Sequence, residues 1–309
     1  MAISPLIPLD ARAIKVISRS ALPSTGWNAA RSENTHGLKG TRMVDCARYG
    51  PWALIAGASE GIGAEFARQL AASGFSLVLL ARNEQLLDEL AEEIRSTHAA
   101  EVRVLALDLT RDDMLDQVRQ ATGDIQVGLV VYNAGASHGM GRFLEAPLEA
   151  SLKLVRLNPL GQVSLSHEFG THMAQRGRGG IILLGSLAGS AGAATVVPYS
   201  ASKAFTQIFA EGLWSELKPL GVDVLYYVVS ATDTPARARL KLKDSAKQIV
   251  ADPADVAREC LDKIAEGPVV VPAHVADSFR EFASLPRRAA AEKMTAHILS
   301  FKDKPVATA

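Results

Sequence analysis

The sequence of 309 residues contains little cysteine, few aromatic residues and no excess of charge of either sign. Two cysteines, Cys46 and Cys260, cannot make a disulfide framework, and no Cys-x-x-Cys pair is present to indicate structural zinc. Lys and Arg together number 33, as do Asp and Glu, so the formal net charge is zero. This balance gives no electrostatic reason to expect nucleic acid as a partner.

Long hydrophobic runs are also lacking. No uninterrupted apolar run approaches the roughly 18 residues of a membrane-spanning helix, so we predict no transmembrane segment. Hydrophobic residues still form 48% of the chain, which is enough for a sizeable core. The composition favours a cytoplasmic globular protein, either an enzyme or a binding module.

Residues 1–42 differ in composition from the rest of the chain. They carry six basic and two acidic residues, with scattered Pro, Ser and Gly and little hydrophobic periodicity. We expect a poorly ordered N-terminal extension here. A disordered tail, a targeting segment and an upstream start before a natural start at Met43 are the interpretations left open.

From Trp52 onward, short apolar runs alternate with longer amphipathic stretches. The apolar runs are nearly continuous, as is typical of strands buried in a parallel sheet. They cover Trp52–Ala56, Leu77–Ala81, Val102–Leu107, Gly128–Tyr132, Ile181–Gly185, Val222–Val229 and Val269–Val271. The helical stretches cover Ile62–Ser73, Glu84–Thr97, Arg111–Thr122, Pro147–Gln175, Tyr199–Lys218 and Pro253–Glu266. This alternation predicts one doubly wound α/β domain over residues 43–309, with about seven parallel strands, helices on both faces and a C-terminal helical tail.

The first predicted strand leads directly into a glycine-rich turn that opens the first helix, Gly57-Ala58-Ser59-Glu60-Gly61-Ile62-Gly63. Glycines in this context let the backbone approach a pyrophosphate, and the N-terminus of the helix favours the negative charge. A tight turn without a ligand is the alternative interpretation.

Arg82 follows the second predicted strand, where an NAD-specific site would place a carboxylate for the ribose hydroxyls. No acidic residue occurs there before Glu84. A guanidinium at this point could bind a 2′-phosphate, which favours NADP(H) and leaves NAD(H) possible. Glu60 would oppose phosphate binding, and a solvated Arg82 at a helix start is the alternative.

Tyr199 and Lys203 are spaced i, i+4 at the start of a predicted helix, which places the phenol and the ammonium on one face. A nearby cation is expected to lower the phenol pKa, as a general acid–base near neutral pH requires. Ser186 ends a strand thirteen residues upstream, at the edge of the sheet where such folds bind ligands.

Taken together, these motifs resemble the short-chain dehydrogenase/reductase family over about residues 51–272. The matching positions are the turn at 56–63, Asp108, Asn133-Ala134-Gly135, Asn158, Ser186, Tyr199 and Lys203. The resemblance implies a Rossmann-type catalytic domain at 43–309 that binds NAD(P)(H).

The resemblance also implies roles for individual residues. Tyr199 would exchange a proton with the substrate oxygen, Ser186 would hydrogen-bond that oxygen, and Lys203 would bind the nicotinamide ribose and tune Tyr199. Asn158 would support a proton relay to Lys203. The implied cofactor contacts are Gly57, Ser59, Glu60, Gly61, Ile62, Gly63, Arg82, Asp108, Leu109, Asn133, Ala134, Gly135, Tyr199, Lys203, Thr232 and Thr234.

Three positions depart from the family pattern. Ala56 stands where the family usually has Thr, and Tyr132 replaces the first of two Asn residues. Val229-Ser230 replaces a Pro-Gly pair after the sixth strand, so the residue that contacts the nicotinamide carboxamide near Thr234 is not fixed by the motif.

We therefore expect an oxidoreductase that transfers hydride between a nicotinamide and a carbonyl or secondary alcohol. A lipophilic substrate of steroid or 3-oxoacyl type is favoured by apolar residues in one expected pocket wall, 191–198. The other wall, 231–250, contains Lys241, Lys243 and Lys247, which would face an anionic group or solvent. A catalytically silent NADP(H)-binding sensor is the alternative, although it would not need Asn158, Ser186, Tyr199 and Lys203 together.

Two further expectations concern partners and metals. The apolar residues of the two longest predicted helices favour a homodimer or homotetramer, as is common in the family. His167, Glu168 and His172 superficially resemble a zinc-protease motif, but the i, i+5 spacing separates the imidazoles, so we predict no metal site.

Overall fold

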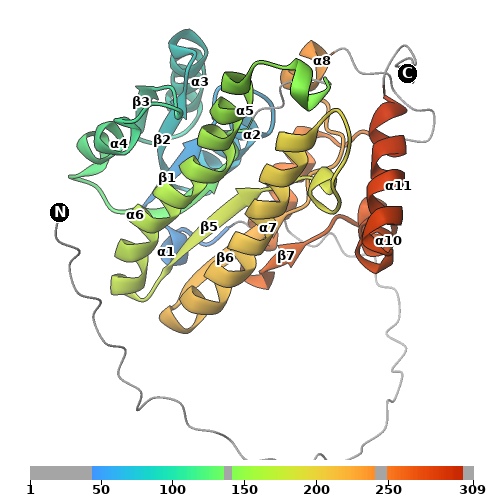
Figure 1. The fold of residues 1–309 in the computed structure, drawn as a ribbon. Helices are drawn as coiled ribbons and strands as arrows, with labels where there is room; N and C mark the ends of the chain where they lie inside the picture. The colour runs from blue at the N-terminus through green and yellow to red at the C-terminus, as the bar shows by residue number, and fades with distance from the viewer. Residues whose placement is uncertain (1–43, 136–140, 241–248, 302–309) are drawn as a thin grey trace, which may run out of the picture. The chain divides into compact units, whose positions relative to one another are not determined.

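The computed structural model describes residues 44–135, 141–240 and 249–301. Seven strands form one parallel sheet in the order β3-β2-β1-β4-β5-β6-β7 (Figure 1). They are β1 (Trp52–Ala56), β2 (Ser76–Ala81), β3 (Val102–Ala106), β4 (Val127–Tyr132), β5 (Gly179–Leu184), β6 (Val222–Tyr227) and β7 (Val269–Val270). The predicted doubly wound parallel sheet is confirmed, whereas the predicted extension at 1–42 lies outside the described residues.

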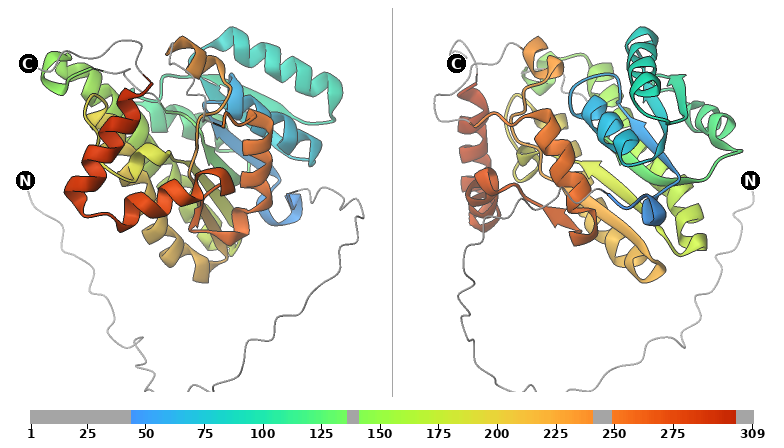
Figure 2. Two further views of the ribbon diagram at one scale, coloured as in Figure 1. Left: turned by 90° about the vertical axis from the view of Figure 1, so that its right-hand side faces the viewer. Right: turned by 180° about the vertical axis from the view of Figure 1, so that it is seen from behind.

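Helices cover both faces of the sheet. The helices before the C-terminal part include α2 (Gly61–Ala72), α3 (Glu84–Thr97), α4 (Met114–Thr122), α5 (Leu148–Val155), α6 (Gly161–Arg176), α7 (Val197–Leu217) and α9 (Pro253–Asp262). One apolar core joins the sheet to α2, α3 and α9, and a second joins its other face to α4, α6 and α7. Figure 2 shows α2 and α9 from behind, on the face turned away from α6 and α7 in Figure 1.

The strand order reverses between β1 and β4, which pair with each other in parallel. One βα connection leads from β1 toward β2, while β4 leads toward β5 on the other side. The connections that leave the two strands at their carboxyl ends therefore diverge and leave a crevice there. This topology positions the candidate site.

The long helix predicted over 147–175 is interrupted. Between α5 and α6, residues Arg156–Leu160 form a π-helical turn that contains Asn158 and Pro159. Pro159 has no N–H to donate to the Val155 carbonyl, and the Gly161 N–H reaches back five residues to the Arg156 carbonyl. The stretch predicted over 147–175 is thus helical, and it contains a π-helical turn because proline removes a bond from the α-helical ladder.

A short helix, α1 (Cys46–Tyr49), precedes β1, and a buried carboxylate fixes it at the amino ends of the strands. Asp223 at the start of β6 is 1% exposed, and it accepts hydrogen bonds from the Tyr49 hydroxyl (2.7 Å) and from Lys218 (2.8 Å). Arg48 forms an ion pair with the same carboxylate. The folded unit therefore includes this helix.

The C-terminal part adds α8 (Pro235–Arg239), α10 (Ala276–Ser284) and α11 (Arg287–Leu299). α11 lies beside the loop that precedes α7, where the Ala194 N–H donates to the Thr295 hydroxyl at 3.0 Å. Among the described residues, no helix is both long and apolar enough to cross a membrane.

Candidate active site

A cleft of about 470 Å³ lies at the carboxyl ends of β1 to β4, and the loops that follow these strands line it. Most of the residues expected to contact a cofactor line it: Gly57, Ser59, Glu60, Gly61, Ile62, Arg82, Asp108, Leu109, Asn133, Ala134, Gly135 and Thr234. Gly63, Thr232, Tyr199 and Lys203 do not. Lys153 and Arg239 also line the cleft, and neither was expected from the sequence.

The glycine turn is built for a close backbone approach. Gly57 has a φ of +82°, and a Cβ there would lie 2.8 Å from the Ala134 backbone. A Cβ at Gly63 would lie 1.9 Å from the Gly57 carbonyl oxygen, which also accepts a 2.8 Å hydrogen bond from Asn133 Nδ2. Gly63 is thus a packing residue, while Gly57 and Asn133 fix the wall of the cleft.

These features fit a dinucleotide. Glu60 is the N-cap of α2 but makes no side-chain capping bond, so its carboxylate leaves the first N–H groups of the helix to another acceptor. N–H groups at a helix N-terminus together with a glycine turn suit a pyrophosphate. The predicted turn without a ligand accounts less well for a cleft of this size.

The charged residues of the cleft include one ion pair, between Glu60 and Arg239, that the sequence did not predict. Arg82 is exposed and makes no hydrogen bond or ion pair with the part of the chain that the structure describes. Glu60, in contrast, is bound by Arg239 of α8 through two hydrogen bonds, one of 2.9 Å. The Glu60 carboxylate that would oppose phosphate binding is therefore paired with a guanidinium from 179 residues further along the chain.

Asp108 lies after β3 as an ionised acceptor. Burial raises its pKa, but hydrogen bonds from the Thr110 N–H (3.0 Å) and hydroxyl (2.8 Å), with Lys153 at 3.4 Å, produce a net lowering of the pKa. A carboxylate that stays ionised can accept the hydrogen bond that the resemblance implies for the adenine.

Lys203 and Tyr199 come from the first turns of α7. Lys203 is 5% exposed, and its ammonium donates to the Leu184 carbonyl at the end of β5 (2.8 Å). Burial lowers the pKa of Lys203 to about 8. Its Nζ lies 5.9 Å from the centre of the Tyr199 ring.

The expected lowering of the Tyr199 pKa is not found. Burial raises the pKa of Tyr199, and a hydrogen bond with the Ser186 side chain lowers it by less. Desolvation of the phenolate outweighs the stabilisation that the neighbouring groups give to it. Tyr199 is accordingly held in its protonated form.

Ser186 is positioned by a residue that the motif did not indicate. The hydroxyl of Tyr226, on β6, accepts a hydrogen bond from the Ser186 N–H at 3.2 Å and donates to its carbonyl at 3.4 Å. A Cβ at Gly185 would lie 2.0 Å from the Tyr226 ring, so glycine is needed before the serine. Because aromatic residues in a buried strand usually belong to the hydrophobic core, the sequence did not indicate this contact.

Asn158 joins this group from the π-helical turn. It is fully buried, and its Nδ2 donates to the hydroxyl of Ser202 (3.0 Å), which in turn donates to the Tyr199 carbonyl (2.7 Å). A Cβ at Gly135 would lie 3.4 Å from Lys203 Nζ and 3.5 Å from Asn158 Oδ1. Both polar groups therefore face the same small space beside Gly135.

The two threonines of the loop after β6 lie in different surroundings. Thr234 lines the cleft, and its hydroxyl caps α8 by accepting from the Arg237 N–H (3.2 Å). Thr232 is buried and donates to the Ser230 carbonyl (3.1 Å), so it lies away from the cleft. Ser230, in place of the family glycine, shares a 2.7 Å hydrogen bond with His274 Nε2. Lys241, Lys243 and Lys247 lie outside the described residues.

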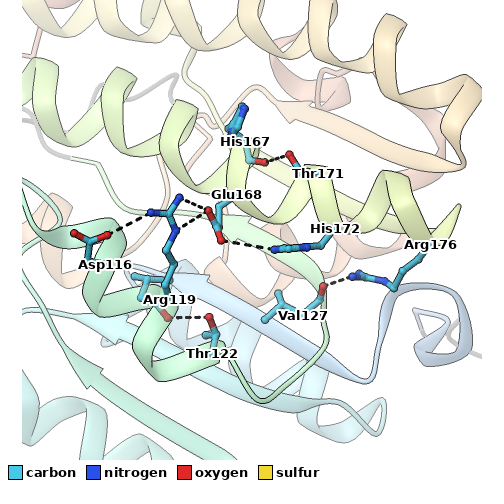
Figure 3. A network of polar contacts seen from close by, with 10 residues as sticks. Asp116, Arg119, Thr122, Val127, His167, Glu168, Thr171, His172 and Arg176 are labelled. Carbon is cyan, nitrogen blue, oxygen red and sulfur yellow. Dashed lines mark hydrogen bonds and ion pairs between the residues drawn. The ribbon is translucent and has the colours of Figure 1, made fainter.

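The histidine pair on α6 does not converge (Figure 3). Glu168 is held by two hydrogen bonds from Arg119, at 2.7 and 2.9 Å, and lies 3.7 Å from His172. The His167 ring points away from this pair in Figure 3. Within the described ranges, no group of three or more His, Cys, Asp or Glu residues is placed to hold a metal ion.

Fold and site together define a dinucleotide-binding α/β protein with a serine–tyrosine–lysine centre at the carboxyl edge of its sheet. The chain belongs to the short-chain dehydrogenase family, whose model matches residues 51–245. Proteins of this family are oxidoreductases that act on CH–OH and C=O groups.

Individual relatives agree with this assignment. A very-long-chain 3-oxoacyl-CoA reductase of Pyricularia oryzae is 38% identical over 202 residues, which cover 63% of this chain and 61% of that protein. The match thus spans less than two thirds of the relative. A structure from work on 7β-hydroxysteroid dehydrogenase stereoselectivity has a TM-score of 0.76 at 27% identity, covering 82% of this chain and 99% of that one. A short-chain dehydrogenase of Sphingobium yanoikuyae in complex with NADPH has a TM-score of 0.68 at 30% identity, covering 84% and 98%.

Proposed function

We propose that the protein reduces lipophilic carbonyl compounds with NADPH. The observation that carries the proposal is the convergence of Ser186, Tyr199 and Lys203 beside a cleft that suits a dinucleotide. A sensor that only binds the cofactor has no use for a buried lysine 5.9 Å from the ring centre of a tyrosine that lies near a serine. The complete set therefore argues against the catalytically silent alternative.

Each residue of the catalytic centre has its own role in the proposed reaction. A bound nicotinamide supplies the hydride for the substrate carbon. Ser186 and Tyr199 hydrogen-bond the carbonyl oxygen, which stabilises the charge that develops there. Tyr199 then gives its proton to that oxygen, and its raised pKa keeps the proton on the phenol until then. Lys203 offers an ammonium for the ribose, and Asn158 faces the same space as Lys203.

The surroundings of Tyr199 support a lipophilic substrate. Its ring packs against an apolar cluster from the loop before α7 and from the two C-terminal helices: Ala191, Ala193, Val196, Phe282, Ala290 and Met294. Three residues of the expected pocket wall, Ala191, Ala193 and Val196, belong to this cluster. The relatives named as a 3-oxoacyl-CoA reductase and a hydroxysteroid dehydrogenase act on substrates of the same character.

A second groove lies on the side of α7 that is turned away from Tyr199 and Lys203. It has a volume of about 720 Å³ and lies between α7 and α11, where Ala201 and Ala204 line it. At 100° per residue, these positions are on the opposite side of α7 from Tyr199 and Lys203. Ala193, Ala194 and Val197, which belong to the expected pocket wall, also line this groove.

A substrate panel tests the proposed activity directly. NADPH consumption would be followed with steroid ketones, long-chain 3-oxoacyl thioesters and, as matched controls, short polar ketones of the same reactivity. We expect turnover of the lipophilic compounds and little of the controls. NADPH binding without turnover of any compound would support the silent sensor, and a preference for short polar ketones would contradict the lipophilic pocket.

The preference for NADPH depends on the charges described above. Replacing Arg82 by Ala should weaken NADPH binding by about 1.5–3 kcal/mol, the usual contribution of a hydrogen bond to a charged group, with less effect on NADH. Replacing Arg239 by Ala should act in the same direction, because it leaves the Glu60 carboxylate unpaired in the cleft. Calorimetric titration with both nucleotides measures the difference.

A double variant and a remote control make this prediction specific. Glu60→Gln combined with Arg239→Ala should recover NADPH affinity, since no unpaired carboxylate remains. Arg280→Ala, which breaks an exposed ion pair with Asp277 on α10, should change neither affinity. Equal weakening of NADPH and NADH by Arg82→Ala would refute the 2′-phosphate assignment.

We also propose that the chain forms a homodimer or homotetramer through α5 and α7. The outer sides of these helices and of the turn after α5 expose large apolar residues: Leu148, Leu152, Val155, Leu160, Phe205 and Ile208. Of the apolar residues expected on this face, Leu160, Phe205 and Ile208 are exposed, whereas Leu165, Phe209 and Leu213 pack in the core. Sedimentation showing only a monomer of 32.8 kDa would rule this out.

A further inference from the structure

Tyr132 departs from the family pattern at the end of β4, and the structure gives it a specific contact. Its side chain is 1% exposed, and its hydroxyl donates a 2.5 Å hydrogen bond to the Leu157 carbonyl. Leu157 lies in the π-helical turn, directly before Asn158.

The turn takes the usual α-helical donor away from this carbonyl. In a regular α-helix the Gly161 N–H would donate to the Leu157 carbonyl, but here it donates to Arg156 instead. The Tyr132 hydroxyl is thus directed at a carbonyl that the change of helical register has released from its usual donor. π-helical turns of this kind occur frequently at functional sites.

Gly161 completes the contact from the other side. A Cβ at this position would lie 2.1 Å from the Tyr132 hydroxyl oxygen and 3.0 Å from the ring carbon that carries it. The tyrosine therefore requires glycine at 161, and the two residues form an interlocked pair on neighbouring elements.

We propose that Tyr132 is a positioning residue for catalysis: its hydroxyl, seated against Gly161, holds the π-helical turn that presents Asn158 to Ser202 and to the space shared with Lys203. This inference rests on the proposed function, because it assigns Tyr132 an effect through Asn158. Among the described residues, Tyr132 does not line the cleft, and its hydroxyl bonds to the carbonyl of Leu157, which does.

The first test is Tyr132→Phe, which removes only the hydroxyl. Displacing catalytic groups by about an ångström can cost 10²-fold, so we expect kcat to fall by about 10- to 100-fold. The KM for NADPH should change less than kcat, because Leu157 is the only described cleft-lining residue that is bonded to the Tyr132 hydroxyl. The matched control is Tyr227→Phe: that tyrosine is equally buried and its hydroxyl also makes a 2.5 Å bond, but to Glu259 on the other face of the sheet. The kcat of Tyr227→Phe should equal that of the parent protein.

The second test is a double-mutant cycle with Gly161→Ala. In the parent the new methyl group collides with the hydroxyl, so both kcat and melting temperature should fall; in the Tyr132→Phe background the same change should be less harmful to both. An unchanged kcat for Tyr132→Phe, or an equal cost of Gly161→Ala in both backgrounds, would overturn the inference. The melting temperatures measure the contact between Tyr132 and Gly161 independently of turnover. The proposed function would be contradicted by a different result, namely an active Tyr199→Phe variant.

Discussion

Replacement of Tyr199 by Phe should lower kcat by at least about 10²–10⁴-fold, the usual contribution of a general acid. The change removes the phenolic oxygen and leaves the ring packed against the apolar cluster of α11 and the loop before α7. Ser186 alone would then hydrogen-bond the substrate oxygen, and no residue at the centre would carry the proton. Single-turnover measurements with saturating NADPH would separate this loss from slow product release.

Two further measurements decide how the kcat of Tyr199→Phe is interpreted: the affinity for NADPH and the remaining turnover. NADPH affinity should change little, because phenylalanine keeps the ring in place and Lys203 keeps its ammonium beside Gly135. Turnover close to that of the parent, with NADPH bound, would show that the proton comes from another group and that the mechanism is wrong.

Lys203→Met should reduce both NADPH affinity and kcat. The substitution keeps the length of the side chain but removes the ammonium beside Gly135 and Asn158. Loss of a hydrogen bond from a charged group to the ribose costs about 1.5–3 kcal/mol, or about 10- to 150-fold in affinity. A further loss in kcat follows if the ammonium helps to hold Tyr199 and its neighbours. Lys263→Met, at an ion pair with Glu259 remote from the cleft, is the matched control.

The pH dependence of Lys203 has a defined sign. Burial lowers its pKa to about 8, and a lysine is charged below its pKa. Contributions that need the ammonium should therefore be complete at pH 7 and decline as the pH rises through about 8. This limb of the kcat/KM profile should disappear in Lys203→Met. A profile that keeps the same limb in the variant would assign the titration to another group.

Much of this architecture could be predicted because it depends on local sequence. Near-continuous apolar runs give the strands, and β1 begins and ends at the predicted residues. Gly57 and the residues that follow it identify the cleft because a positive φ and a close approach both demand glycine. Tyr199 and Lys203 were located by a helical spacing that brings them to one face.

Other features depend on contacts that no local pattern encodes. Arg239 reaches Glu60 only because α8 folds back over the glycine turn, and Tyr226 reaches Ser186 across neighbouring strands. The pKa of Tyr199 was predicted in the wrong direction because charge spacing is visible in a sequence and burial is not. Pro159 is visible in the sequence, but the change of helical register around it was not predicted.

The attachment of α1 has a practical consequence for how the protein can be handled. Tyr49 and Asp223 place the beginning of the described chain at the amino ends of the strands, whereas the cleft lies at their carboxyl ends. A purification tag or a fused fluorescent protein joined ahead of residue 44 would enter the fold on the side remote from substrate and cofactor. At the other terminus, α11 packs beside the loop that leads to Tyr199, so immobilising the protein through its N-terminal side is the arrangement that leaves the catalytic edge accessible.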